Sequence, residues 1–207
     1  MMGIITAERA GHSLPTSPVE PAVLGTPGLV VLGITALAVS LCDAEIVPPA
    51  AGALLLLTLC GGLGQLLVAA RDWRRGNIFS ATVFAAYGLF WLSLIPLVIL
   101  PRAGQGASPQ AQALSAYLAI WGIFSIVLFR SFAKNNRSMR VMFGFLASFL
   151  LLAAAGAATQ SNPMQTTSGY VGILFGIDAV VVGFVRNRSE KGQGHQGDTY
   201  SIGRKGR

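Results

Sequence analysis

Charged residues are scarce in this 207-residue chain. Only 11% of the residues are charged, whereas 53% are hydrophobic, and the mean hydropathy is +0.61. A water-soluble domain of this length could not bury so much apolar surface in one core. The composition therefore excludes an ordinary soluble domain and predicts that a lipid bilayer surrounds most of the chain.

Residues that carry most enzymatic and metal chemistry are also few. The two histidines, His12 and His195, lie near the ends of the chain, and the two cysteines, Cys42 and Cys60, do not have metal-ligand spacing. The sequence has no paired carboxylates, no nucleophile with a nearby base and no phosphate-binding loop. We therefore expect no enzymatic activity, no cofactor and no metal, and interpret the cysteines as small apolar side chains.

What the sequence does contain is six long apolar runs. Most of them approach the roughly 20 residues that cross a hydrocarbon layer of about 30 Å as an α-helix. Short loops separate the runs, so consecutive helices should be antiparallel neighbours. This pattern predicts an all-α integral membrane protein, a six-transmembrane-helix bundle in the plasma or inner membrane. The runs are residues 27–41, 50–70, 79–100, 111–132, 141–158 and 169–185.

The two ends differ in composition from the predicted transmembrane domain, residues 27–186. Residues 1–26 are mixed and rich in proline, without the arrangement of a secretory signal. Residues 187–207 are rich in glycine and in polar and basic residues. We expect a disordered N-terminal tail and a flexible basic C-terminal tail close to anionic lipid headgroups.

The positive charge of the chain is confined to one side of the predicted membrane. Of fifteen lysines and arginines, fourteen lie in the N-terminal tail, two alternate loops and the C-terminal tail, and only Arg102 lies elsewhere. The positive-inside rule then predicts that both termini are cytoplasmic. Because the net charge of +7 lies in segments that flank apolar runs, we expect no nucleic-acid partner.

Gln65 and Asp178 are the strongest polar signals inside the apolar runs. An ionised carboxylate near the bilayer centre costs at least about 2.5 kcal/mol, so Asp178 should face protein or water. One hypothesis makes Asp178 a titratable proton site, and the alternative is an inward carboxylate bonded to a neighbouring helix. Hydroxyl groups such as that of Thr35 are weaker signals, because they usually bond to the preceding helical turn.

Two of the runs share the spacing Ala-Tyr-x-x-x-Trp, which places both rings on one helix face. Tyr87 and Trp91 fall near mid-membrane, where an unpaired buried hydroxyl costs about 1 to 3 kcal/mol. The Tyr87 hydroxyl should therefore face the bundle interior and find a partner or line a pore. Tyr117 and Trp121 fall nearer the surface, where headgroup anchoring is an equally good explanation.

Glycines recur within the runs and predict where helices pack closely, the alternative being vacant volume for a water path. They include Gly28 and Gly33, the cluster Gly61, Gly62 and Gly64, and the Gly-x-x-x-Gly pair Gly172 and Gly176.

One segment of the third run carries a family resemblance. Gly76-Asn77-Ile78-Phe79, followed by residues 84–91, Phe-Ala-Ala-Tyr-Gly-Leu-Phe-Trp, resembles the signature of the acetate uptake transporter family, also called the succinate-acetate permease or GPR1/FUN34/YaaH family. The resemblance extends over about residues 21–185. Further matches in order and spacing are Gly61-Gly62-x-Gly64-Gln65, then Tyr117, Trp121, Gly122 and Phe124, then Gly169, Gly172 and Gly176.

The resemblance implies a transporter or channel for acetate and other short monocarboxylates, in some members succinate. Passage would be passive or proton-coupled, through a pore in each subunit of a homo-hexamer. The family's constriction of Phe, Tyr and Leu falls on Leu32, Tyr87 and Leu146, so the first position departs from the family. The expected substrate pathway adds donors and rings, namely Thr35, Gln65, Asn77, Trp91 and Trp121.

Two further departures leave alternatives open. Glu20-Pro21-x-x-Leu24-Gly25 and Thr26-Pro27-Gly28 both resemble the family's first-helix motif, so its register is undecided. Asp178 stands where the family has a small residue. A channel for another small solute, such as ammonia, and a non-transporting membrane sensor or assembly protein are the remaining alternatives.

Overall fold

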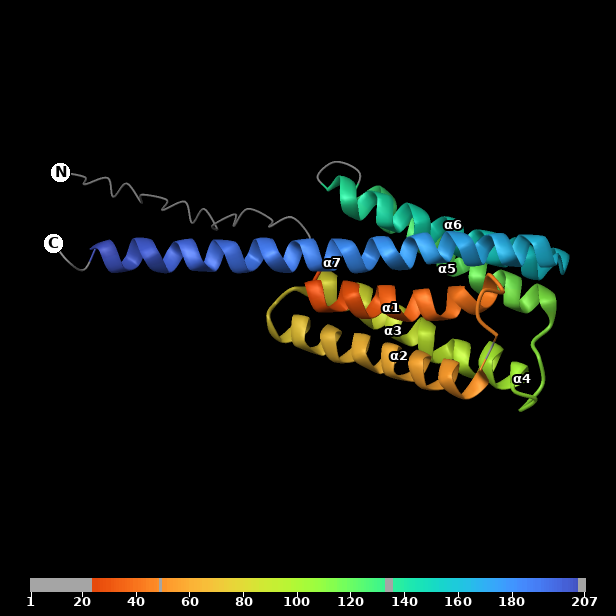
Figure 1. Cartoon of the computed structure of the whole chain (residues 1–207). Coiled ribbons are helices and arrows are strands. Elements are labelled where there is room, and N and C mark those ends of the chain that lie inside the picture. The colour runs from red at the N-terminus through yellow and green to blue at the C-terminus, as the bar shows by residue number, and fades with distance from the viewer. Residues whose placement is uncertain (1–23, 49, 133–135, 205–207) are drawn as a thin grey trace, which may run out of the picture.

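A computed structural model describes residues 24–48, 50–132 and 136–204, and its regular structure is helical throughout (Figure 1). Six of its helical segments are long and apolar enough to cross a membrane. The predicted fold class, a six-helix transmembrane bundle, is therefore confirmed. The elements are α1 (Thr26–Asp43), α2 (Ala51–Arg74), α3 (Ile78–Leu94), the π-helix η1 (Ile95–Ile99), α4 (Leu100–Arg102), α5 (Ala111–Ser131), α6 (Arg137–Thr159) and α7 (Asn162–Arg204).

The third span consists of α3, η1 and α4 in direct succession, residues Ile78–Arg102. Pro96 lies at the start of η1 and has no N–H to donate to the preceding turn. The wider π turn accommodates this missing bond, and the helix continues to Arg102. The sequence analysis placed the end of this run at residue 100 and did not anticipate the π turn.

The sixth span runs from Asn162 to Asn187, but α7 itself continues to Arg204 (Figure 1). The sequence analysis expected a flexible tail from residue 187, whereas the described backbone is helical to residue 204. The expected N-terminal tail lies outside the described residues up to position 23.

The spans pack in the order α3, α2, α1, α7, α6 and α5, each against the next. Aromatic side chains of α3 and α5 then meet and close the bundle. Large apolar side chains such as Leu67, Ile120 and Phe184 point outward and are exposed, as expected for a surface that faces lipid. The buried core thus lies at the centre of a closed arrangement of six spans.

Glycines allow α1 and α7 to approach closely. A Cβ atom on Gly33 would lie 2.7 Å from the carbonyl oxygen of Gly176, and one on Gly176 would lie 2.9 Å from the carbonyl oxygen of Gly33. A Cβ on Gly172 would overlap the hydroxyl oxygen of Ser40. The packing explanation for these glycines is therefore confirmed.

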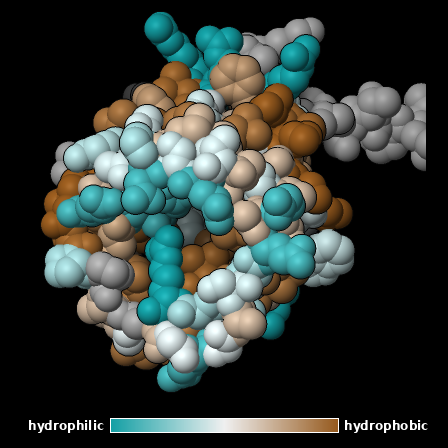
Figure 2. Space-filling model, turned by 90° about the vertical axis from the view of Figure 1, so that its right-hand side faces the viewer, coloured by the Kyte–Doolittle hydropathy of each residue, from teal (hydrophilic) through white to brown (hydrophobic). Residues whose placement is uncertain are grey.

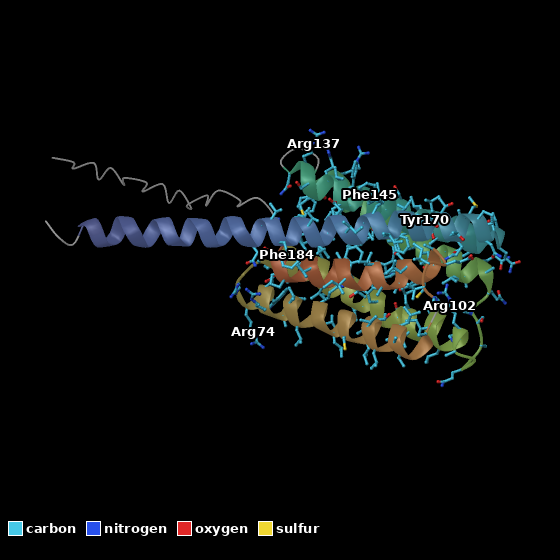
Figure 3. The ribbon with its side chains drawn as sticks, viewed as in Figure 1. Arg74, Arg102, Arg137, Phe145, Tyr170 and Phe184 are labelled. Carbon is cyan, nitrogen blue, oxygen red and sulfur yellow. The ribbon has the colours of Figure 1, made fainter. Side chains whose placement is uncertain are left out.

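The two ends of the bundle differ in charge (Figure 3). Arg74 and Arg137 lie at one end, which we call the basic end, and Arg102 lies towards the other, which we call the Arg102 end. Further basic residues at the basic end are Arg71, Arg75, Arg130, Arg140 and Arg186, which lie at the same ends of α2, α5, α6 and the sixth span.

At the basic end a buried carboxylate connects α1, α2 and α3. The hydroxyl of Ser80 donates to Asp72 Oδ2 at 2.6 Å, and the backbone N–H of Gly25 donates to the Ser80 hydroxyl oxygen at 3.0 Å. Asn77 caps α3 by accepting the N–H of Ser80 at 3.2 Å. These bonds fix the start of α1 and α3 against the end of α2.

Replacing Ser80 with alanine should lower stability, because the buried Asp72 carboxylate loses its hydroxyl donor. Hydrogen bonds to charged groups contribute about 1.5 to 3 kcal/mol, so we expect a clear drop in the thermal unfolding temperature of the purified protein. Thr82→Ala is a matched control, since Thr82 is exposed and its hydroxyl bonds to Ile78 of its own helix. Equal unfolding temperatures for the two variants would contradict a stabilising role for this network.

Candidate functional site

Aromatic rings fill the middle of the bundle between α3, α5 and α6. The Tyr87 ring lies 6.0 Å from Trp121 and 5.7 Å from Phe124, and Phe90 lies 5.1 Å from Trp121, all between ring centroids. The two Ala-Tyr-x-x-x-Trp segments of the sequence therefore pack against each other. We call these rings the aromatic cluster: Tyr87, Phe90, Trp91, Tyr117, Trp121, Phe124 and Phe143.

The hydroxyl groups of the aromatic cluster are already bonded. Ser125 donates to the carbonyl oxygen of Trp121 at 2.8 Å, so its one proton is used there. The Tyr87 hydroxyl, 2.8 Å from Ser125 Oγ, is then the donor to Ser125. Ser93 likewise donates to the Phe90 carbonyl oxygen and is hydrogen-bonded to Tyr117. The expected partner of Tyr87 exists, and this tyrosine has no proton left for a ligand.

Four other buried residues carry a donor without a hydrogen-bond partner within the described residues, namely Ser40, Thr58, Gln65 and Trp91. Both amide atoms of Gln65, which is 0% exposed, lack a hydrogen-bond partner within the described residues, and so does Trp91 Nε1. By contrast, the Thr35 hydroxyl donates to the carbonyl oxygen of Val31 at 2.8 Å within its own helix. Because buried polar groups are normally satisfied, these unbonded atoms are the candidates for contact with a ligand or water in this interior.

A cavity of about 150 Å³ extends from the aromatic cluster towards the Arg102 end. Phe90 and Trp91 line its inner part, and Asp43, Arg102 and Gln165 line its far end. A cavity of about this size holds a benzene molecule in another protein, so this one has room for a small organic solute. Its walls are mostly apolar and include Leu94, Leu118, Phe149, Leu150 and Ala153.

A second hollow of about 280 Å³, which we call the mouth, opens the Arg102 end. The mouth and the cavity share three lining residues, Asp43, Arg102 and Gln165. Figure 2 looks onto this end and shows a central recess with hydrophilic residues around it and hydrophobic residues deeper inside. The other residues that line the mouth are Cys42, Glu45, Val47 and Pro48.

The three expected constriction residues lie together in the core. Leu32, Tyr87 and Leu146 are each 0% exposed and belong to one cluster of buried residues. None of them lines the cavity. Tyr87 and Leu146 lie about one helical turn nearer the basic end than the cavity residues Phe90 and Phe149. Buried side chains at this level therefore lie between the cavity and the basic end.

The remaining expected site residues are less closely associated with the cavity. Asn77 caps α3 at the basic end, and Trp121 is part of the aromatic cluster. Asp178 is half-buried on α7 and does not line the cavity, and its Oδ2 has no hydrogen-bond partner within the described residues. The sequence analysis did not select Asp43, Arg102 or Gln165, although the isolated position of Arg102 among the basic residues was a signal.

Residues 12–191 match the GPR1/FUN34/yaaH family. The chain belongs to this family. It is 34% identical over 171 residues to a protein of Methanothermobacter thermautotrophicus, covering 79% of this chain and 82% of that protein. It is 31% identical over 120 residues to the succinate-acetate/proton symporter SatP of Escherichia coli K12, covering 58% of this chain and 64% of SatP.

A solved structure of this family is also similar to the fold. The bacterial acetate channel SatP superimposes with a TM-score of 0.74 at 27% identity, covering 80% of this chain and 92% of that chain. With six apolar spans and these relatives, the protein is a multi-pass protein of the cell membrane.

Proposed function

We propose that this protein passes acetate and related short-chain carboxylates, with succinate as a further candidate, across the cell membrane through the interior of its bundle. The observation that carries this proposal is the cavity of about 150 Å³, which leads from the mouth to Trp91, whose Nε1 has no hydrogen-bond partner within the described residues. SatP, whose structure the fold matches, is an acetate channel. No chemical step is proposed.

The cavity suits a small carboxylate because it offers different surfaces to the two ends of such a molecule. Apolar walls tolerate a methyl group, whereas a carboxylate that leaves water needs donors. Gln65 and Trp91 supply N–H groups that no side chain occupies within the described residues. We infer that Trp91 contacts the carboxylate or its water inside the cavity, and that Gln65, which does not line the cavity, does so further along the pathway.

Leu32, Tyr87 and Leu146 form the proposed neck of the pathway. Two leucines and a ring make a hydrophobic constriction that gates by excluding water. Passage through the neck is either passive or coupled to a proton. A coupling role for Asp178 stays a prediction, because its carboxylate lies outside the cavity.

The direction of the pathway follows from the charge distribution. We propose that the basic end faces the cytoplasm, with both termini inside, because cationic residues concentrate there. The mouth would then open to the outside. Assembly into a homo-hexamer is an expectation from the family resemblance.

Acetate flux into proteoliposomes tests the proposed function directly. Labelled acetate should enter vesicles that contain the wild-type protein much faster than empty vesicles. Gln65→Leu, which keeps the side chain's approximate size, should lower this flux by about tenfold, because one lost ligand bond of about 1.4 kcal/mol has that effect. Gln112→Leu is the matched control, since Gln112 is exposed at the start of α5.

Equal acetate flux in protein-containing and empty vesicles would refute the carboxylate assignment. The same vesicles loaded with a pH-sensitive dye and exposed to ammonia would then test the ammonia alternative. Flux of neither solute would favour a non-transporting membrane protein on this fold.

A further inference from the structure

Asp43, Arg102 and Gln165 separate the mouth from the cavity. They come from three elements, α1, α4 and α7, and line both hollows. A solute that moves from the mouth into the cavity therefore passes these three side chains.

The guanidinium of Arg102 has donors available for a ligand. Within the described residues its one hydrogen bond runs from Nη2 to Asp43 Oδ1 at 3.0 Å. A guanidinium carries five N–H donors in a planar fork that fits a carboxylate. The Arg102 side chain is 40% exposed and the Asp43 side chain 8%, so the cation of this ion pair is the more accessible partner.

The negative charge of Asp43 needs a nearby cation more than the positive charge of Arg102 needs an anion. It is the last residue of α1, where the helix dipole disfavours a negative charge. The Arg102 guanidinium stabilises its carboxylate through the ion pair, and the Gln165 side chain lines the same two hollows beside it. A second carboxylate that reached Arg102 would compete with Asp43 for the same cation.

Arg102 is also the one lysine or arginine at this end of the described bundle. The loops at the Arg102 end, residues 44–50, 103–110 and 160–161, contain no lysine or arginine. Glu45 lines the mouth together with Asp43. Without Arg102 the mouth would present only negative charge and would repel an anion.

We propose that Arg102 captures the carboxylate group of the substrate at the mouth and that Asp43 competes with the substrate for the guanidinium. This proposal rests on the proposed function. The exposed donors of Arg102 bind the incoming anion, and Asp43 limits the strength of this binding because two carboxylates share one cation. The anion is therefore held long enough to enter the cavity and weakly enough to leave the mouth.

Two variants with opposite expected effects test this proposal. Arg102→Gln should raise the acetate concentration for half-maximal influx at least about fivefold, and Asp43→Asn should lower it by a similar factor. If the ion pair had only a structural role, both variants should shift the half-maximal acetate concentration in the same direction, since either variant breaks the pair. The measurement is the initial rate of labelled acetate influx into intact cells, with acetate only in the medium.

Three controls separate charge recognition from general damage. Arg102→Lys keeps the positive charge but loses the planar guanidinium, so its half-maximal acetate concentration should lie between those of the wild type and Arg102→Gln. Arg137→Gln removes one exposed positive charge at the basic end and should leave the half-maximal concentration unchanged. Influx of acetamide, which is neutral, should be the same in Arg102→Gln and the wild type.

An equilibrium titration keeps this proposal distinct from the proposed function. Trp91 lines the cavity, so acetate binding to the solubilised protein can be followed by tryptophan fluorescence without transport. If the wild type passes no acetate, the proposed function fails, while the titration still decides whether Arg102 binds the anion. The proposed capture site would be wrong if Arg102→Gln left the acetate affinity unchanged. It would also be wrong if Arg102→Gln and Asp43→Asn shifted the acetate affinity in the same direction.

Discussion

Replacing Tyr87 with alanine should abolish discrimination between acetate and larger carboxylates. The ring of Tyr87 is fully buried next to Trp121, Phe124 and Phe143 and fills the proposed neck. Its removal widens the constriction and admits water. We expect the ratio of succinate to acetate flux in proteoliposomes to rise at least about tenfold, which corresponds to a barrier lowered by about 1.4 kcal/mol.

Tyr87→Phe is the control for the hydroxyl group. It keeps the ring, and Ser125 still donates to the Trp121 carbonyl oxygen, so no buried hydroxyl proton loses its acceptor. This variant should retain wild-type selectivity. The Tyr87→Ala variant loses a large buried ring, which costs about 3 to 5 kcal/mol of stability, so its flux must be divided by the amount of folded protein. An unchanged flux ratio in folded Tyr87→Ala would place the neck elsewhere.

Replacing Gly176 with leucine should strongly destabilise the fold. The Cβ atom alone would lie 2.9 Å from the backbone carbonyl oxygen of Gly33, and no side-chain rotation can relieve a contact between a Cβ and a backbone. The α1 and α7 helices must therefore move apart along their whole crossing. We expect a loss of about 3 kcal/mol or more, seen as a much lower thermal unfolding temperature or as aggregation during size-exclusion chromatography.

Gly52→Leu provides a matched substitution at a position without this contact. Gly52 lies near the start of α2 and is exposed, and a Cβ atom added there would meet no atom of another helix within 4 Å. The unfolding temperature of this variant should stay close to that of the wild type. If both leucine variants had the same unfolding temperature, close approach of α1 and α7 would not be a source of stability.

The spans could be predicted from sequence because two physical constraints act along the chain. The bilayer requires about 20 apolar residues per helix, and cations mark the loops on one side. The predicted runs accordingly agree with the described helices to within a few residues at most ends. The helical extension after Asn187 was not predictable in this way, because residues such as Gly192 and Gly194 carry no apolar pattern.

The chemistry of the interior could be predicted only in part. The sequence predicted a hydrogen-bond partner for the Tyr87 hydroxyl. It could not identify this partner as Ser125, because Ser125 is on a different helix. The bond from the Thr35 hydroxyl to its own helix could be predicted from the residue type, whereas the absence of a partner for the Gln65 amide within the described residues could not. Asp43 and Arg102 are 59 positions apart and come together only through the fold.

The π turn that contains Pro96 also determines the direction in which Arg102 points. A π turn takes up one residue more than an α turn, and one residue of an α-helix corresponds to a rotation of about 100°. Every side chain after η1 is therefore rotated by roughly this angle relative to an uninterrupted helix. A change at Pro96 that restored a regular α-helix would therefore turn the Arg102 guanidinium away from the Asp43 carboxylate on α1.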